Sequence, residues 1–109
     1  MKRYEVILTE HALLDLDDIA RYVALHDTPE RAEYVARRLE KAFSSLATLP
    51  NRANHPSELL AMGNRSFREV HFKPYRIVYR VLDREVLVLI IADGRRDMRA
   101  LLARRLLSA

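Results

Sequence analysis

The feature that most constrains this chain is a change in the spacing of its apolar residues at about position 67. Between residues 10 and 49, apolar side chains recur three or four positions apart, which predicts amphipathic helices. Between residues 67 and 92, they alternate with polar residues or run without a break, which predicts β-strands. Helices followed by a group of strands are typical of the α+β class, in which one sheet packs against helices.

The helical part divides at the sequence HDTPE. Thr28 is a good N-cap residue, and Pro29 suits the first position of a helix. We therefore expect one helix that begins at Glu10 and a second that runs from Pro29 to about Leu49. Two antiparallel helices joined by so short a turn form a helical hairpin.

The remaining elements complete a predicted single domain, residues 1–109, with the order βααβββα. They are a strand at 4–9, a loop with a short helical turn at 50–66, strands at 67–72, 75–82 and 85–92, and a helix at 97–107. Because the strand at 85–92 is apolar on both faces, we expect it at the centre of the sheet. The predicted fold class is α+β, with a helical hairpin packed on an antiparallel-rich sheet.

The positive charge of the chain lies in its second half. Residues 1–54 hold 8 basic and 9 acidic residues, whereas residues 55–109 hold 11 basic and 6 acidic ones. Ten of those 11 basic residues are arginines, whose planar fork of donors suits carboxylates and phosphates. This half therefore predicts an anionic partner, either nucleic acid or an acidic protein surface. The alternative is a basic surface that serves only solubility.

The composition also argues against several classes of protein. The chain has no cysteine, so it holds neither a disulfide nor a thiolate metal site. Its longest apolar run, residues 86–92, is far short of the roughly 18 residues that cross a bilayer. Asp15, Asp17 and Asp18 stand near the start of a helix, where they fit the helix dipole better than a metal. We expect a cytoplasmic protein without membrane contact, metal or cofactor.

The sequence DGRRD, residues 93–97, links the last strand to the last helix. Gly94 allows the chain to turn there, and Asp97 is a suitable N-cap for the helix. The aspartates on either side of Arg95 and Arg96 predict pairing of acidic with basic side chains inside the turn. We interpret the double arginine as a recognition element at the joint between the sheet and the last helix.

Several motifs occur in one order along nearly the whole chain. They are LTEHALLDLDDIARYVA after the first strand, a Pro-started helix ending at LATLP, Gly-x-Arg at 63–65, YRIVYRV, and an apolar strand that closes on GRRD. In this order the chain resembles the RelE/ParE superfamily of bacterial toxins from type II toxin–antitoxin systems. The resemblance implies a RelE/ParE-like fold and a toxin that an antitoxin neutralises.

Two activities divide this superfamily. RelE-like members cut mRNA in the ribosomal A site, whereas ParE-like members bind DNA gyrase and block it. Of the positions that carry RNA cleavage in the nucleases, Arg76 and Arg96 are kept here. The nuclease lysines are matched by Phe67 and Glu69, and the C-terminal tyrosine by Leu102. Because cleavage needs a base, an acid and cations beside the phosphate, these departures favour the ParE-like branch.

The resemblance thus implies a toxin without catalytic residues that inhibits DNA gyrase by binding and is neutralised by a ParD-like antitoxin. Operator DNA is then bound only through the antitoxin. The residues expected to contact gyrase are Arg95, Arg96, Asp97 and Met98, and those expected to contact the antitoxin are Arg76, Arg80, Met98, Leu101 and Leu102. The apolar face of the last helix has a second interpretation, because it can close the domain's own core instead.

A RelE-like, ribosome-dependent mRNA endonuclease stays open as the alternative. In it, Arg76 and Arg96 bind phosphate, and His71 or Arg68 replaces the missing groups. A family member that binds its antitoxin but has lost its toxicity is a third alternative.

Overall fold

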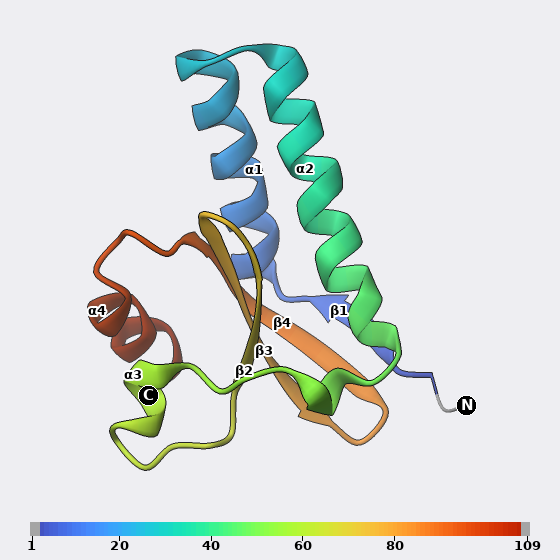
Figure 1. Ribbon diagram of the computed structural model, residues 1–109, viewed down its shortest axis with the longest axis vertical. Helices are drawn as coiled ribbons and strands as arrows, with labels where there is room; N and C mark the ends of the chain where they lie inside the picture. The colour runs from blue at the N-terminus through green and yellow to red at the C-terminus, as the bar shows by residue number, and fades with distance from the viewer. Residues whose placement is uncertain (1–2, 108–109) are drawn as a thin grey trace.

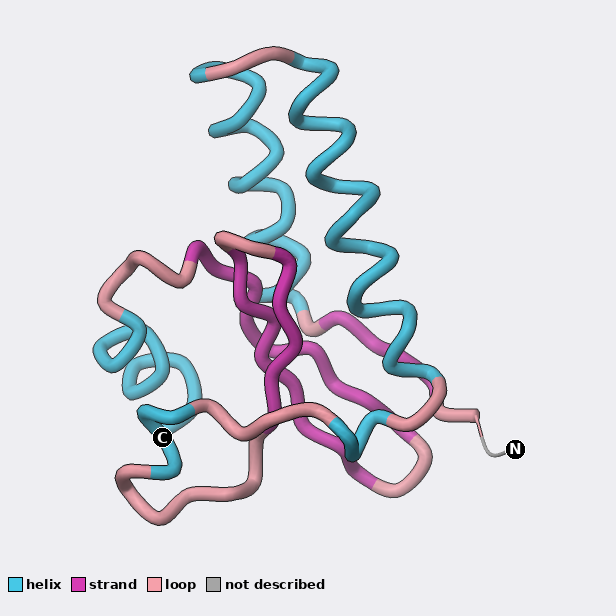
Figure 2. Tube along the Cα trace, in the orientation of Figure 1, coloured by secondary structure: helices cyan, strands magenta, loops and turns pink. Residues whose placement is uncertain are grey.

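The computed structural model describes residues 3–107, which form a four-stranded sheet with helices on both faces (Figure 1). The strands are β1 (Glu5–Leu8), β2 (Arg68–Phe72), β3 (Tyr75–Leu82) and β4 (Glu85–Asp93). The helices are α1 (Glu10–His26), α2 (Pro29–Ser44), α3 (Ser57–Leu60) and α4 (Met98–Leu102), with short turns η1 (Ser45–Ala47), η2 (Pro50–Arg52) and η3 (Ala103–Leu107). The predicted α+β class and the hairpin of α1 and α2 are confirmed (Figure 2).

Both long helices begin where the sequence predicts. The Thr9 hydroxyl accepts a hydrogen bond from the Ala12 amide at the start of α1, and the Thr28 hydroxyl caps α2 in the same way. The predicted end of the second helix at Leu49 is wrong, since α2 ends at Ser44. The next turn tightens into η1, where the Ser45 hydroxyl donates to the Ala42 carbonyl, 2.6 Å away. A serine that bonds the backbone in this way weakens the regular helix.

The sheet has the strand order β1-β4-β3-β2, so β4 lies inside the sheet, as predicted from its two apolar faces. β4 pairs antiparallel with β3, and β3 antiparallel with β2. β1 pairs parallel with β4, in a register that ends with Leu8 opposite Val88. Because β4 continues to Asp93, its last five residues extend beyond β1.

A β-bulge in β4 shifts the alternation of its side chains by one residue. Before the bulge the even-numbered side chains face α1 and α2, and after it the odd-numbered ones do. Val88 pairs with Tyr79 but Ile90 pairs with Val78, so Leu89 is an extra residue in the ladder. Val88 and Ile91 consequently pack in one core cluster with α1 and α2, whereas Ile90 packs in the other. Simple alternation along the strand assigns Val88 and Ile90 to the same face, and the bulge overrides it.

The second core cluster lies on the sheet face opposite the helical hairpin. It joins Val78 and Ile90 of the sheet to Leu59 of α3 and to the apolar side chains of α4. The predicted last helix at 97–107 is regular only through Leu102, and its continuation forms a wider π-type turn, η3. The sheet is therefore covered on both faces, with α3 and α4 beside each other in Figure 1.

Candidate functional site

The turn after β4 is organised by the carboxylate of Asp93. This carboxylate accepts hydrogen bonds from the Arg95 backbone amide at 2.9 Å, from Arg95 Nε at 3.0 Å and from Arg95 Nη2 at 2.6 Å. These bonds hold the pKa of Asp93 below its usual value and raise the pKa of Arg95. The predicted pairing inside the DGRRD turn is thus present for Asp93 and Arg95.

Arg96 and Asp97 have different positions in the same turn. Asp97 caps α4, because its side chain accepts a hydrogen bond from the Ala100 amide at 3.1 Å. Arg96 is exposed, and within residues 3–107 its guanidinium forms neither an ion pair nor a hydrogen bond. The structure therefore presents one arginine that is already paired, Arg95, and one that is free to bind an anion.

Gly94 is needed for close packing and not for a special backbone angle, which corrects the sequence interpretation. Its φ is not positive, unlike that of Gly63. A Cβ at position 94 would lie 2.9 Å from Arg76 Cδ, closer than side chains approach, and 3.2 Å from the Pro74 carbonyl oxygen, which is a tight contact. The glycine thus lets the end of β4 pass directly over the side chain of Arg76.

The apolar face of α4 is closed within the domain. Met98, Leu101 and Leu102 are almost fully buried in the second core cluster. Their burial favours the second interpretation of this face, in which it closes the domain's own core, and contact of these side chains with the antitoxin stays a prediction. Sequence spacing shows only that a helix face is apolar, and the same spacing serves an intramolecular core and a partner interface alike.

Arg76 is held between two carboxylates. Its Nη1 and Nη2 donate to the Glu58 carboxylate at 2.8 and 2.7 Å, and its Nε donates to Glu69 at 2.8 Å. The bonds from Arg76 lower the pKa of Glu58 to about 2, and the two carboxylates raise the pKa of Arg76. A phosphate or an acidic partner is repelled by these carboxylates, so the expected role of Arg76 in binding anions is not supported.

The other residues of the nuclease alternative do not complete a cleavage site around Arg76. His71 Nε2 lies 3.2 Å from Glu69, and Arg68 donates to the Ala53 carbonyl at 2.6 Å. Arg80 lies on the exposed part of β3, with its guanidinium carbon 5.9 Å from the centre of the Phe67 ring. Within residues 3–107 no group of three or more acidic, histidine or cysteine side chains could hold a metal ion.

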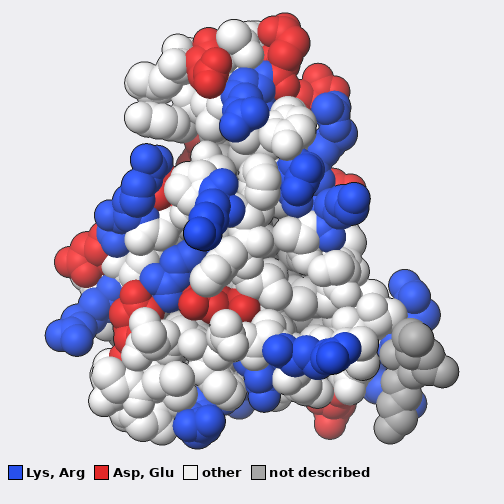
Figure 3. All heavy atoms as spheres, viewed as in Figure 1, with Lys and Arg blue, Asp and Glu red and all other residues white. Residues whose placement is uncertain are grey.

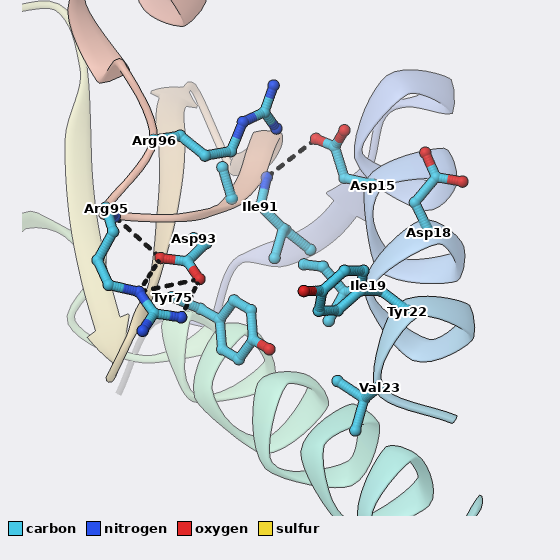
Figure 4. A pocket seen from close by; sticks show the side chains of 11 residues that line it. Asp15, Asp18, Ile19, Tyr22, Val23, Tyr75, Ile91, Asp93, Arg95 and Arg96 are labelled. Carbon is cyan, nitrogen blue, oxygen red and sulfur yellow. Dashed lines mark hydrogen bonds and ion pairs between the residues drawn. The ribbon is translucent and has the colours of Figure 1, made fainter. Parts of the chain in front are cut away.

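A cavity of about 420 Å³ lies between α1 and the end of β4 (Figure 4). Its apolar wall includes Ile19, Tyr22 and Tyr75, and its charged rim includes Asp18 and Arg96. Tyr22 is 63% exposed, whereas Tyr75 is partly buried, and this burial raises the pKa of Tyr75. No sequence pattern predicts this cavity, because its wall comes from α1, β3 and β4 together.

Asp15 has a different role from the one predicted. Its carboxylate accepts a hydrogen bond from the Ile91 amide of β4 at 3.1 Å and forms an ion pair with Arg105 of η3. Arg105 also donates to the Leu89 carbonyl at 3.2 Å. Asp15 thus joins α1 to β4 and to the C-terminal segment, whereas the exposed Asp17 pairs with Arg21 on the helix surface.

Comparison with known proteins decides the family. The model of the ParE toxin of the type II toxin–antitoxin system parDE matches residues 6–98. The chain belongs to the ParE toxin family. This ParE-family toxin is 31% identical over 100 residues to Toxin ParE3 of Caulobacter vibrioides (strain ATCC 19089 / CIP 103742 / CB 15), covering 92% of this chain and 96% of that one.

The fold of this ParE-family toxin is also found in a solved structure. A chain from the chromosomal ParDE TA system of P. aeruginosa superposes with a TM-score of 0.73 at 18% identity, covering 85% of this chain and 98% of that chain. The chain is thus a toxin of the ParE kind from a type II toxin–antitoxin system, as the resemblance implied. In the part that the structure describes, no helix is long and apolar enough to cross a membrane.

Proposed function

We propose that this ParE-family toxin inhibits DNA gyrase by binding it, without catalysing a reaction, and that a ParD-like antitoxin neutralises it in the cytoplasm. The observation that carries the proposal is the state of the two arginines shared with the nucleases. Arg76 is bonded to Glu58 and Glu69, whereas Arg96 is exposed with no ion pair in the described chain. Because Arg76 is held by two carboxylates, Arg96 is the one of these two arginines that can bind an anionic surface, and the two do not act together on a phosphate.

The turn of residues 93–98 is the proposed contact with gyrase. Arg95 and Arg96 are exposed on it, and Asp97 and Met98 fix its join to α4 by capping and by burial. On the face shown in Figure 3, basic side chains lie over α2 and the β2–β3 hairpin, and acidic ones gather near the tip of the α1–α2 hairpin and near α3. The basic area over α2 and the β2–β3 hairpin favours a partner with an acidic surface.

A supercoiling assay with purified gyrase and relaxed plasmid tests the proposal. The toxin is expected to inhibit supercoiling at micromolar concentration, and the antitoxin to restore it. Arg37→Ala, which removes an exposed arginine of α2 that pairs with Glu33, is the control and should inhibit as the wild type does. If the toxin leaves gyrase unaffected and translating ribosomes with the toxin yield A-site cuts in mRNA, the nuclease alternative holds instead.

We also propose that operator DNA is bound only through the antitoxin. We expect the toxin alone not to bind its operator and the toxin–antitoxin complex to bind it. An electrophoretic mobility shift with operator DNA separates the two cases, since a shift by the toxin alone contradicts this division of roles.

A further inference from the structure

The end of β4 is a strand edge without a neighbouring strand on the side of α1. β1 pairs with β4 only as far as Val88, and the described chain has no other strand beside residues 89–93 on that side. Side chains occupy part of this edge. Arg105 binds the Leu89 carbonyl, and the Ile91 amide donates to the Asp15 carboxylate. A strand edge that keeps free backbone groups is a template for pairing with another chain.

The ladder between β3 and β4 identifies the backbone groups that remain. The Gly94 amide donates to the Pro74 carbonyl at 2.7 Å, and Asp93 stands opposite Tyr75. Asp93 and Ile91 are therefore at positions whose N–H and C=O groups point away from β3, toward α1. The Ile91 amide already has Asp15 and the Asp93 carbonyl accepts from the Arg96 amide, which leaves the Ile91 carbonyl and the Asp93 amide at the edge.

These two groups select the direction of an added strand. In a parallel ladder, one residue of the added strand donates to the Ile91 carbonyl and accepts from the Asp93 amide. In an antiparallel ladder, a residue opposite Ile91 needs both the amide and the carbonyl of Ile91, and Asp15 holds that amide. A strand that runs parallel to β4, in line with β1, thus fits the edge as it stands.

The cavity beside this edge provides a place for a side chain of the added strand. Alternate side chains of a strand point to the same face, so one of them reaches the wall of Ile19, Tyr22 and Tyr75. Figure 4 shows these side chains around the space between α1 and the end of β4. At about 420 Å³ the cavity has room for a large aliphatic or aromatic side chain.

The charges at the rim restrict the sequence of the segment. Asp15 and Asp93 each form an ion pair with an arginine, whereas among residues 3–107 Arg96 and Asp18 form no ion pair. Both line the cavity. We therefore expect the segment to carry an acidic residue on one side of its apolar residue and a basic residue on the other. The acidic residue pairs with Arg96 and the basic residue pairs with Asp18.

We infer that the free edge of β4 binds an extended segment of the antitoxin as a parallel strand, with a large apolar side chain in the cavity. This inference rests on the proposed antitoxin partnership and adds the place and direction of one contact. Main-chain pairing provides affinity in such added strands, and the pocket for alternate side chains provides specificity.

Binding of the full-length ParD-like antitoxin from the same operon to toxin variants tests the inference. Tyr22→Glu and Arg96→Glu are expected to weaken binding at least about tenfold. Their controls are Leu25→Glu, at an 81% exposed position of α1 outside the cavity, and Arg99→Glu on α4, which should bind within about twofold of wild type. Circular dichroism checks that each variant is folded.

Hydrogen exchange gives a readout that needs no substitution. The amide of Asp93 is expected to exchange at least about tenfold more slowly in the complex than in the free toxin. If the wild-type toxin does not bind the antitoxin at all, the proposed partnership fails. If it binds but neither cavity variant weakens binding and the Asp93 amide is unchanged, the partnership stands and the placement on β4 is wrong.

Discussion

Arg105 and Asp15, 90 positions apart in the sequence, form an ion pair in which the two side chains are only 18% and 10% exposed. The same two side chains bond the backbone of β4 at Leu89 and Ile91. One charged pair thus ties the C-terminal segment, α1 and the central strand together at the place where β1 ends.

Removal of one member of this pair is expected to destabilise the fold. Arg105→Ala leaves the carboxylate of Asp15 without its partner, which should lower the free energy of unfolding by about 3 kcal/mol. Urea denaturation measures the change. Arg99→Ala, at an exposed arginine of α4, is the matched control and should change stability by less than about 0.5 kcal/mol. Equal stability of the two variants contradicts a structural role for the pair.

Stability in acid should depend on Glu58. Arg76 lowers the pKa of Glu58 in the folded protein to about 2 from its ordinary value of 4.5, so the unfolded chain binds the proton more readily. The stabilisation is therefore complete above about pH 5 and is lost as the pH falls toward 2.

Glu58→Gln is expected to remove this pH dependence and to cost about 2 kcal/mol at pH 7. Urea midpoints at a series of pH values for wild type and variant should converge as the pH falls toward 2. Glu33→Gln, which changes an exposed carboxylate of α2 paired with Arg37, serves as the control. A difference between wild type and Glu58→Gln that stays constant from pH 7 to about pH 2 rules out this linkage.

The close approach of Gly94 to Arg76 should make even a methyl group costly there. Gly94→Ala forces the Arg76 side chain or the Pro74 carbonyl to move, which is expected to cost about 1–3 kcal/mol and to loosen the contacts of Arg76 with Glu58 and Glu69. Gly63→Ala is an informative comparison, because a Cβ there meets no atom within 4 Å and the cost comes only from a φ of +76°. That cost is about 1 kcal/mol. Thermal unfolding compares the two, and only Gly94→Ala should raise the pKa of Glu58 measured by NMR.

The two arginines of the turn should differ in their effect on stability. Arg96→Ala removes an exposed side chain without an ion pair in the described chain, so stability should change by less than about 0.5 kcal/mol while gyrase inhibition weakens about tenfold or more. Arg95→Ala also frees Asp93, which raises the pKa of that carboxyl. Dose–response curves in the supercoiling assay measure the inhibition. Full inhibition by both single variants contradicts the proposed gyrase contact.

Much of the fold could be predicted because its signals are local. Thr9 and Thr28 cap helices through hydrogen bonds to amides three residues away, and the strands follow the alternation of their own side chains. The position of β4 inside the sheet also follows from its composition, since a strand that is apolar on both faces must be covered on both. The end of α2 at Ser44 was not predicted, because the last turn of a helix depends on a small difference in free energy between competing hydrogen bonds.

The candidate site was predictable only in part. The sequence placed Arg95, Arg96 and Asp97 in a turn between the sheet and the last helix, and the structure has that turn. It did not show that Arg76 is held by Glu58 and Glu69, because those contacts span 18 and 7 positions and depend on how the α3 loop folds over the sheet.

The sequence by itself determined the order of helices and strands, the caps of the long helices and membership of the RelE/ParE superfamily. The order and the caps rest on hydrogen bonding and burial patterns within short segments, whereas the superfamily rests on the resemblance of the motifs. The tertiary structure alone decided that Met98 and its neighbours face inward, that Leu89 is a bulge and that β4 has a free edge beside a cavity. These depend on contacts between segments far apart in the chain, such as Asp15 with Arg105, and residue spacing does not specify which distant side chains meet.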